Sequence, residues 1–311
     1  MELPIGAWRG ISDLARVLAP DSLLTGLITS AINIRGPRKQ SIIMCSKPGE
    51  DHMPEYSTIL FSVRDKVAHL TLNRPQAANW LNATLSAEMM DAVVHCKEDA
   101  DIRAIVVSGT GRFFCAGADL KGFYSAGSEL KSRVSVFHAT ISRLARADLP
   151  VIAAVNGAAA GAGMGLACAC DLVIAADSAR FTMAYTKIGL SPDGTTTYFL
   201  PRRIGIGRAM ELVLLNRTLS AKEALDWGIA NRVVADESLA EETHSTAAQL
   251  AAGPTRAYGA AKRLMHSGFT ESLETQIEME LRSIGAMART QDAREAIAAF
   301  TAKRAPVFTG R

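Results

Sequence analysis

The chain has 311 residues, of which 48% are hydrophobic and 21% are charged, and its formal net charge is +3. This apolar share is enough for a sizeable core, and Lys and Arg are scattered rather than gathered into the basic surface of a nucleic-acid-binding protein. No uninterrupted apolar run reaches about 18 residues, so we expect no membrane-spanning helix and no membrane partner.

The five cysteines are odd in number and include no CxxC pair; they are Cys45, Cys96, Cys115, Cys168 and Cys170. A disulfide scaffold and a zinc site are therefore not expected, and a cytoplasmic location fits a chain of free thiols. Cys168 and Cys170 stand in a run of small residues and are expected to pack as small apolar side chains.

Residues 1–52 show no helical or strand period, whereas a regular pattern begins just after Met53. Acidic residues in this segment argue against a transit peptide, and no signal-peptide pattern is present. Two interpretations remain, namely a loosely attached extension or a start codon placed too early, with Met53 as the natural start. The break in composition favours the second. We therefore divide the chain into an extension over 1–52, a core over 53–235 and a helical region over 236–311.

Strands and helices alternate from residue 56 onward. Alternating or short continuous apolar runs predict strands over 59–63, 67–72, 102–107, 151–155 and 172–176, with residues 64–66 as the turn of a hairpin. Apolar residues at helical spacing predict helices over 86–97, 129–146 and 162–170. Because this alternation is typical of parallel sheets with crossover helices, the predicted fold class is α/β.

The end of the chain is predicted to be helical. Ser220 and Glu223 have the spacing of a capping box that begins a short helix. Further helices are predicted over about 236–252, 254–267 and 270–303, separated by glycine and proline. Amphipathic helices that follow a complete sheet domain need a partner surface for their apolar stripes.

Two segments rich in Gly and Ala each follow a predicted strand and enter a helix; they are GTGRFFCAGADL (109–120) and NGAAAGAGMG (156–165). Gly117 permits a tight turn that leaves the N–H of Ala118 pointing outward. The first N–H groups of a helix beginning near Ala162 have no intrahelical acceptor. Two such amides converging on one point form an oxyanion hole, although close packing also explains each segment by itself. A dinucleotide site is excluded, because the spacing is not GxGxxG.

These segments belong to a set of motifs that resembles the crotonase (enoyl-CoA hydratase/isomerase) superfamily over about residues 54–305. In the family's order and spacing, the matching motifs are LNRP (72–75), FCAGADL (114–120), PVIAAVNG (150–157), CDLVIA (170–175) and WGIANRVV (227–234). The resemblance implies a crotonase-like spiral of ββα units, a C-terminal helical trimerisation region and acyl-CoA thioester substrates. It also implies a homotrimer or homohexamer, and no cofactor or metal beyond the coenzyme A of the substrate.

Matched position by position, the resemblance implies that the oxyanion-hole amides are those of Ala118 and Ala162. Seven neighbouring residues are expected to contact the substrate; they are Ala116, Gly117, Asp119, Leu120, Gly161, Tyr185 and Phe137. The basic residue with which the family often meets the coenzyme A phosphates is Ala78 here, and Lys262 or Arg263 could take its place.

The sequence departs from the hydratase pattern at the two glutamates that hold and deliver water, which fall on Gly165 and Tyr185. The carboxylate that remains is Asp193 in LSPDG (190–194), although Pro-Asp-Gly is also ordinary turn chemistry. 1,2-Epoxyphenylacetyl-CoA isomerases are similar through FTMA (181–184) and KIGLSPD (187–193) and have an aspartate at this position. A carboxylate beside an apolar pocket suits a proton shuttle.

A second resemblance, to 4-chlorobenzoyl-CoA dehalogenases, extends over AADSARF (175–181) and AMELVLLNRTL (209–219). Their nucleophilic aspartate matches Asp193 and their active-site histidine matches His138, whereas their tryptophan partner is Tyr185 here. His138 is equally explained as an ordinary helix residue. Three hypotheses follow. The favoured one is an isomerase that moves a double bond with Asp193 as acid and base; the others are a nucleophilic-aspartate enzyme and a non-catalytic acyl-CoA-binding protein.

Overall fold

The structure, a computed structural model, describes residues 54–125 and 127–311, which lie in a compact unit over His52–Arg311. The expected extension over 1–52 lies outside the described residues. Within the described ranges, none of the helices is both long and apolar enough to span a membrane.

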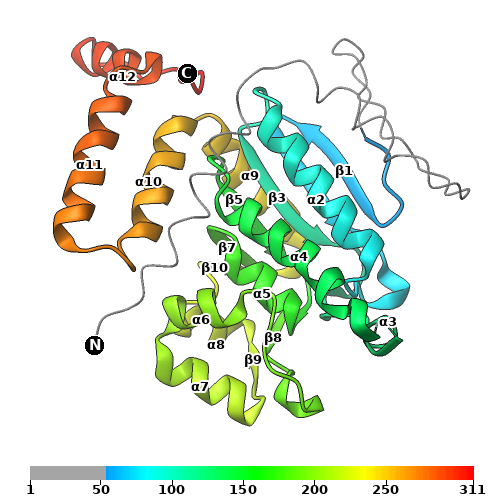
Figure 1. Cartoon of the computed structure of the whole chain (residues 1–311). Helices are drawn as coiled ribbons and strands as arrows, with labels where there is room; N and C mark the ends of the chain where they lie inside the picture. The colour runs from blue at the N-terminus through cyan, green and yellow to red at the C-terminus, as the bar shows by residue number, and fades with distance from the viewer. Residues whose placement is uncertain (1–53, 126) are drawn as a thin grey trace, which may run out of the picture. The chain divides into compact units, whose positions relative to one another are not determined.

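A six-stranded sheet forms the centre of this unit, in the order β1-β2-β3-β5-β7-β10 (Figure 1). Its strands are β1 (Ile59–Arg64), β2 (Val67–Leu72), β3 (Ala104–Gly109), β5 (Val151–Val155), β7 (Leu172–Ala176) and β10 (Arg232–Val234). β1 pairs with β2 in an antiparallel hairpin whose turn residues, Asp65 and Lys66, both have positive φ. The other pairs are parallel. The predicted hairpin and parallel sheet are therefore confirmed.

A second sheet of four short strands was not predicted from the sequence. Its order is β4 (Phe113–Cys115), β6 (Ala158–Ala160), β8 (Arg180–Thr182) and β9 (Thr218–Ser220). β4, β6 and β8 each follow a strand of the central sheet and precede a helix. The chain therefore repeats a unit of two strands and a helix, which is the expected spiral of ββα units.

Helices cover both faces of the central sheet. Figure 1 shows α2 (Ala83–Glu98) and α4 (Leu130–Ala145) side by side on one face and α9 (Leu239–Ala251) on the other. The remaining helices are α3 (Leu120–Ser125), α5 (Ala162–Ala169), α6 (Thr196–Ile204), α7 (Ile206–Leu215), α8 (Ala221–Trp227), α10 (Thr255–Ser267), α11 (Leu273–Met287) and α12 (Gln291–Thr301). Short 3-10 turns are η2 (Pro75–Ala77), η3 (Gly127–Glu129), η4 (Thr186–Ile188) and η5 (Asp236–Ser238).

The single helix predicted over 270–303 is wrong, because the structure has two helices there. Thr290 interrupts the helical backbone with an extended conformation, and its Oγ1 accepts a hydrogen bond of 3.1 Å from the N–H of Ala293. A threonine whose hydroxyl caps the next helix ends the first one. The expected capping box of α8 is confirmed at Ser220 and Glu223.

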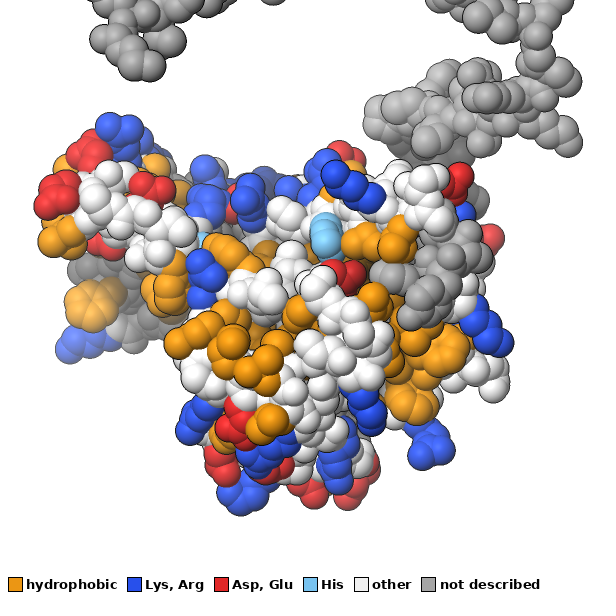
Figure 2. Space-filling view, turned by 60° about the horizontal axis from the view of Figure 1, so that its bottom comes forward, with side chains coloured by type: hydrophobic (Ala, Val, Ile, Leu, Met, Phe, Trp, Pro, Cys, Tyr) orange, Lys and Arg blue, Asp and Glu red, His pale blue; other side chains and the backbone are white. Residues whose placement is uncertain are grey.

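Large apolar side chains remain exposed on several helices. On α11 they recur at helical spacing as Leu273, Ile277, Leu281 and Ile284, and this helix buries none of its residues. On the face formed by the elements at the bottom of Figure 1, hydrophobic side chains gather in the middle and Lys and Arg side chains lie mostly around them (Figure 2). Exposed stripes of this kind are typical of surfaces that bury against a partner.

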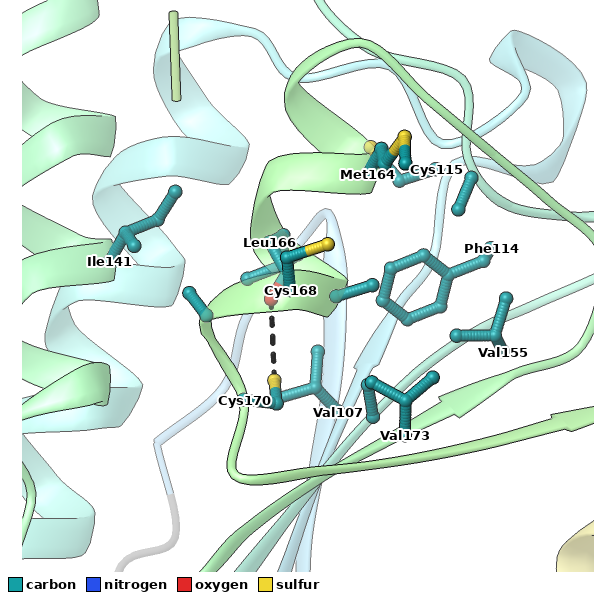
Figure 3. Packing of buried hydrophobic residues seen from close by; sticks show 14 of the residues in the cluster. Val107, Phe114, Cys115, Ile141, Val155, Met164, Leu166, Cys168, Cys170 and Val173 are labelled. Atoms are coloured by element: carbon teal, nitrogen blue, oxygen red, sulfur yellow. Dashed lines mark hydrogen bonds between the residues drawn. The ribbon is translucent and has the colours of Figure 1, made fainter. Parts of the chain in front are cut away.

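The cysteines of β4 and of α5 with its C-terminal cap, which are Cys115, Cys168 and Cys170, pack as apolar side chains. Figure 3 shows Cys168 and Cys170 among apolar neighbours that include Leu166, and the Sγ of Cys170 donates to the Leu166 carbonyl oxygen at 3.3 Å. Burial raises the pKa of Cys168 to about 11 and the pKa values of Cys115 and Cys170 to about 12. Thiols held this far from ionisation are poor nucleophiles, so the expected packing role is confirmed.

Candidate active site

A cavity of about 730 Å³ opens between α3, α4, α5 and the 183–193 segment. Most of its wall is apolar and includes Trp80, Leu130, Val134, Met183, Ile188 and Leu190. Three lysines also line it, namely Lys121, Lys131 and Lys187. Within the part of the chain that the structure describes, Asp193 is the one acidic residue that lines the cavity. A largely apolar cavity with one carboxylate suits proton transfer on a hydrocarbon group.

Two residues whose backbone N–H groups have no acceptor among the described residues line this cavity from different parts of the chain. Gly117 has a φ of 100°, and an ideal Cβ there would lie 3.1 Å from the carbonyl oxygen of Ala160. Glycine thus permits the turn that brings Ala118 to the wall. The carbonyl oxygen of Gly117 accepts from the N–H of Leu81, whereas the N–H of Ala118 meets no acceptor within the described part of the chain.

The second N–H group belongs to Ala162, the first residue of α5. Gly161 precedes it with a φ of 53°, and the first turn of a helix leaves its N–H groups without intrahelical acceptors. The N atom of Ala162 lies 3.8 Å from the position that a Cβ on Gly117 would occupy. Ala118 and Ala162 both line the cavity. Two N–H groups on neighbouring turns are the arrangement that an oxyanion hole requires.

Asp193 is fixed at the cavity wall by its neighbours in the chain. The hydroxyl of Tyr185 donates to Oδ1 of Asp193 at 2.8 Å. The hydroxyl of Thr196 donates to the main-chain oxygen of Asp193 at 2.6 Å, and the Thr196 N–H donates to the same oxygen at 3.1 Å. Burial, and then the charge of Asp193, raise the pKa of Tyr185, so Tyr185 remains a phenol and a donor.

His138 lies on α4 behind the Asp193 loop and does not line the cavity. Its Nε2 accepts a hydrogen bond of 3.0 Å from the N–H of Gly194. The imidazole therefore acts as a hydrogen-bond acceptor in this contact. This hydrogen bond holds the backbone of Gly194, the residue next to Asp193.

Gly165, the position of one hydratase glutamate, lies against the same loop. An ideal Cβ there would lie 2.3 Å from the carbonyl oxygen of Gly194 and 2.8 Å from Oγ1 of Thr196. No side chain fits in that space without movement of the loop. The position of the other glutamate holds Tyr185, which is engaged with Asp193.

The structure brings together most of the residues that the sequence singled out. Five of the seven expected contact residues line the cavity beside Asp193 and the two alanines; they are Ala116, Gly117, Leu120, Gly161 and Tyr185. Phe137 does not line it, because its ring is buried beneath Gly194, where an ideal Cβ would lie 3.2 Å from Phe137 Cε1. Asp119 faces Arg74 instead, with 3.6 Å between Oδ2 and Nη2.

The basic residues suggested for coenzyme A phosphates are engaged elsewhere. Lys262 Nζ lies 2.7 Å from Oδ2 of Asp171, and Arg263 pairs with Asp148. The lysines at the cavity are Lys121, Lys131 and Lys187 instead, and sequence reasoning missed them. Lys121 follows the FCAGADL motif directly and Lys187 begins KIGLSPD. Their positions next to these motifs were the signal in the sequence that could have placed them at the cavity.

Comparisons with known proteins agree with this geometry. A family model described as enoyl-CoA hydratase/isomerase matches residues 62–311. The 1,2-epoxyphenylacetyl-CoA isomerase of Escherichia coli is 42% identical over 258 residues, which cover 81% of this chain and 98% of that protein. The 4-chlorobenzoyl coenzyme A dehalogenase-2 of an Arthrobacter species is 37% identical over 244 residues, covering 77% and 88%. The crystal structure of an enoyl-CoA hydratase from Bacillus anthracis is similar with a TM-score of 0.79 and 34% identity, covering 82% and 100%.

Proposed function

Because the chain belongs to the enoyl-CoA hydratase/isomerase family, we propose that it is an acyl-CoA isomerase that moves a double bond with Asp193 as the acid and base. The observation that carries the proposal is the cavity in which one carboxylate stands beside two free N–H groups. The proposed reaction needs no cofactor beyond the coenzyme A of the substrate.

The chemistry begins with a thioester carbonyl oxygen against the N–H groups of Ala118 and Ala162. The carboxylate of Asp193 removes a proton from the α-carbon of a β,γ-unsaturated acyl group, and the electron pair of the broken C–H bond moves onto the carbonyl oxygen. The two N–H groups stabilise this dienolate. The carboxylic acid of Asp193 then returns the proton to the γ-carbon, which leaves the double bond between the α- and β-carbons. In other enzymes, loss of one such N–H donor lowers kcat by about 10²–10³-fold.

Hydration by two glutamates has little support in this site. Gly165 has no room for a side chain beneath Gly194, and Tyr185 already donates to Asp193. Among the described residues that line the cavity, Asp193 therefore stands without the second carboxylate that would hold and deliver water.

A nucleophilic Asp193, as the similarity to a dehalogenase suggests, is the second candidate. The donor contact from Tyr185 at the position of the dehalogenase tryptophan favours it. In that reaction the carboxylate attacks a ring carbon, halide leaves, and water must then cleave the ester with help from a base. The histidine at the matching position, His138, lies outside the cavity lining and uses its Nε2 to accept from Gly194, so this histidine is not placed to activate that water. This difference favours the isomerase.

The test is Asp193→Asn, which preserves size and removes the charge. Short, medium-length and aryl β,γ-unsaturated acyl-CoAs are offered to the purified chain, and turnover, dissociation constant and α-proton exchange in deuterium oxide are measured. Loss of a positioned general base should slow turnover by ~10²–10⁴-fold, abolish α-proton exchange and leave affinity nearly unchanged. Asp226→Asn, on the exposed face of α8, is the matched control. Full turnover in Asp193→Asn rules out this reaction, and a trapped acyl adduct on the wild type would establish the nucleophilic alternative instead.

A further inference from the structure

The contacts of Tyr185 reach both halves of the proposed reaction. Its hydroxyl donates to the carboxylate of Asp193 at 2.8 Å. Its ring also lies against the turn that begins α5, where Cζ is 3.6 Å and Cε1 is 3.8 Å from the ideal Cβ position of Gly161. Gly161 directly precedes Ala162, which lines the cavity. One rigid aromatic ring therefore spans the distance between the carboxylate and the amide.

From these contacts we propose that Tyr185 is a positioning residue for Asp193. The phenol fixes Oδ1, leaves Oδ2 as the oxygen that takes the substrate proton, and holds the carboxylate at a set distance from the Ala162 N–H. This inference rests on the proposed role of Asp193 as the base.

The direction of the hydrogen bond follows from the surroundings of the phenol. Tyr185 is only 9% exposed, and burial followed by the neighbouring charge raises its pKa. The hydroxyl hydrogen therefore stays in place over the pH range in which enzymes are assayed. A hydrogen bond donated to a carboxylate stabilises the charged form over the acid, and the charged form is the one that removes a proton.

A separate group holds the main chain of Asp193, so the effect on the carboxylate can be isolated. Thr196 donates from its hydroxyl to the main-chain oxygen of Asp193 at 2.6 Å. The phenol also donates to that main-chain oxygen, at the longer distance of 3.2 Å, and its oxygen lies 3.4 Å from Thr196 Oγ1. Removing the phenol should therefore free the carboxylate while the loop stays attached through Thr196 and His138.

Other titratable groups near Asp193 are unchanged by this substitution. The charged groups that line the cavity are Lys121 on α3, Lys131 on α4 and Lys187 on η4. His138 on α4 contacts the next residue, Gly194. Because all four remain in place, a change in the acidic limb of the pH–rate profile on loss of the phenol reports the contact between Tyr185 and Asp193.

The experiment measures kcat, KM and the pH–rate profile of Tyr185→Phe with β,γ-hexenoyl-CoA, or with the best substrate from the panel above. Hydrogen bonds to charged groups are strong enough that their loss should lower kcat about 10-fold. The acidic limb of the profile should move to higher pH, because the phenol no longer donates to the carboxylate, with KM little changed. Tyr198→Phe, whose exposed ring lies under Arg202 outside the cavity, should match the wild type.

Thr196→Val separates positioning of the carboxylate from support of the loop. It removes the hydroxyl that holds the main chain, so it should lower kcat or the thermal midpoint without moving the acidic limb. If Tyr185→Phe also leaves the acidic limb in place while Asp193→Asn is inactive, the positioning role is overturned and the proposed function stands. If Asp193→Asn keeps full turnover, the proposed function fails and this inference fails with it.

Discussion

Adding one methyl group at Gly165 should remove most of the activity, because the loop that carries Asp193 already occupies the space. The new Cβ would lie 2.3 Å from the carbonyl oxygen of Gly194, whereas ordinary contact begins at 3.4 Å. Either the loop that carries Asp193 or helix α5 must therefore move by about 1 Å. α5 cannot retreat, because an ideal Cβ on Gly163 of the same helix would lie 2.1 Å from the Cys115 carbonyl oxygen. The displacement thus falls on the loop.

The expected size follows from the displacement. Misplacing a catalytic group by about 1 Å can cost ~10²-fold in rate, and overpacking a buried site costs about 1–3 kcal/mol of stability. The assay compares kcat and thermal midpoint for Gly165→Ala and for Gly207→Ala on α7. At Gly207 an ideal Cβ meets nothing within 4 Å, and Ala favours a helix over Gly by about 1 kcal/mol, so that control should match or exceed the wild type in stability. Wild-type kcat in Gly165→Ala would refute the packing argument.

Two further predictions concern assembly and pH. We expect a trimer or a dimer of trimers in light scattering. Leu281→Asp, at a side chain 65% exposed on α11, should lower the mass of the assembly, whereas Glu274→Gln on the same helix should not. A monomeric wild type at micromolar concentration contradicts this prediction. Burial, then Arg64 and His244, lower the pKa of His69 below its ordinary 6.5, so the folded state binds this proton more weakly than the unfolded state. The stabilisation of the folded state that depends on neutral His69 is fully present above about pH 6.5 and is lost as the pH falls below that value. His69→Gln should therefore reduce the fall in thermal midpoint between about pH 7.5 and about pH 5, whereas His95→Gln should not, and equal falls in wild type and His69→Gln would disprove the linkage.

The sequence predicted the parts of the site that depend on local backbone chemistry. The turn at Gly117 and the start of α5 at Ala162 follow from glycine content and strand-to-helix spacing, and Ala118 and Ala162 both line the cavity. The part that depends on packing between distant segments could not be predicted. The contact of His138 with Gly194 joins residues 56 positions apart, and no local pattern specifies which way that imidazole faces.

The short strands had no recognisable signal in the sequence, whereas the break between α11 and α12 had one. The strands of the second sheet have three residues each, too few for alternation to be recognised. The end of α11, by contrast, was available in the sequence, because Thr290 is followed by Asp292 in the first turn of the next helix. A hydroxyl residue before an acidic first turn is a start signal for a helix, and it was hidden by the continuous apolar period across the break.

The two positions that hold glutamates in the hydratase pattern, Gly165 and Tyr185, both contact the loop that carries Asp193. Gly165 leaves room for the carbonyl oxygen of Gly194, and the hydroxyl of Tyr185 donates to Asp193. Neither position is therefore free to hold a catalytic glutamate while the loop stays where it is. Restoring a glutamate at Gly165 should therefore not create a hydratase. The larger side chain must displace Gly194, and the charge of Asp193 would remain beside it without a second water-holding group. We expect Gly165→Glu to lose isomerisation and gain no hydration of α,β-hexenoyl-CoA. Hydration in that single variant would show that the loop yields freely and that its close packing on α5 does not set the position of Asp193.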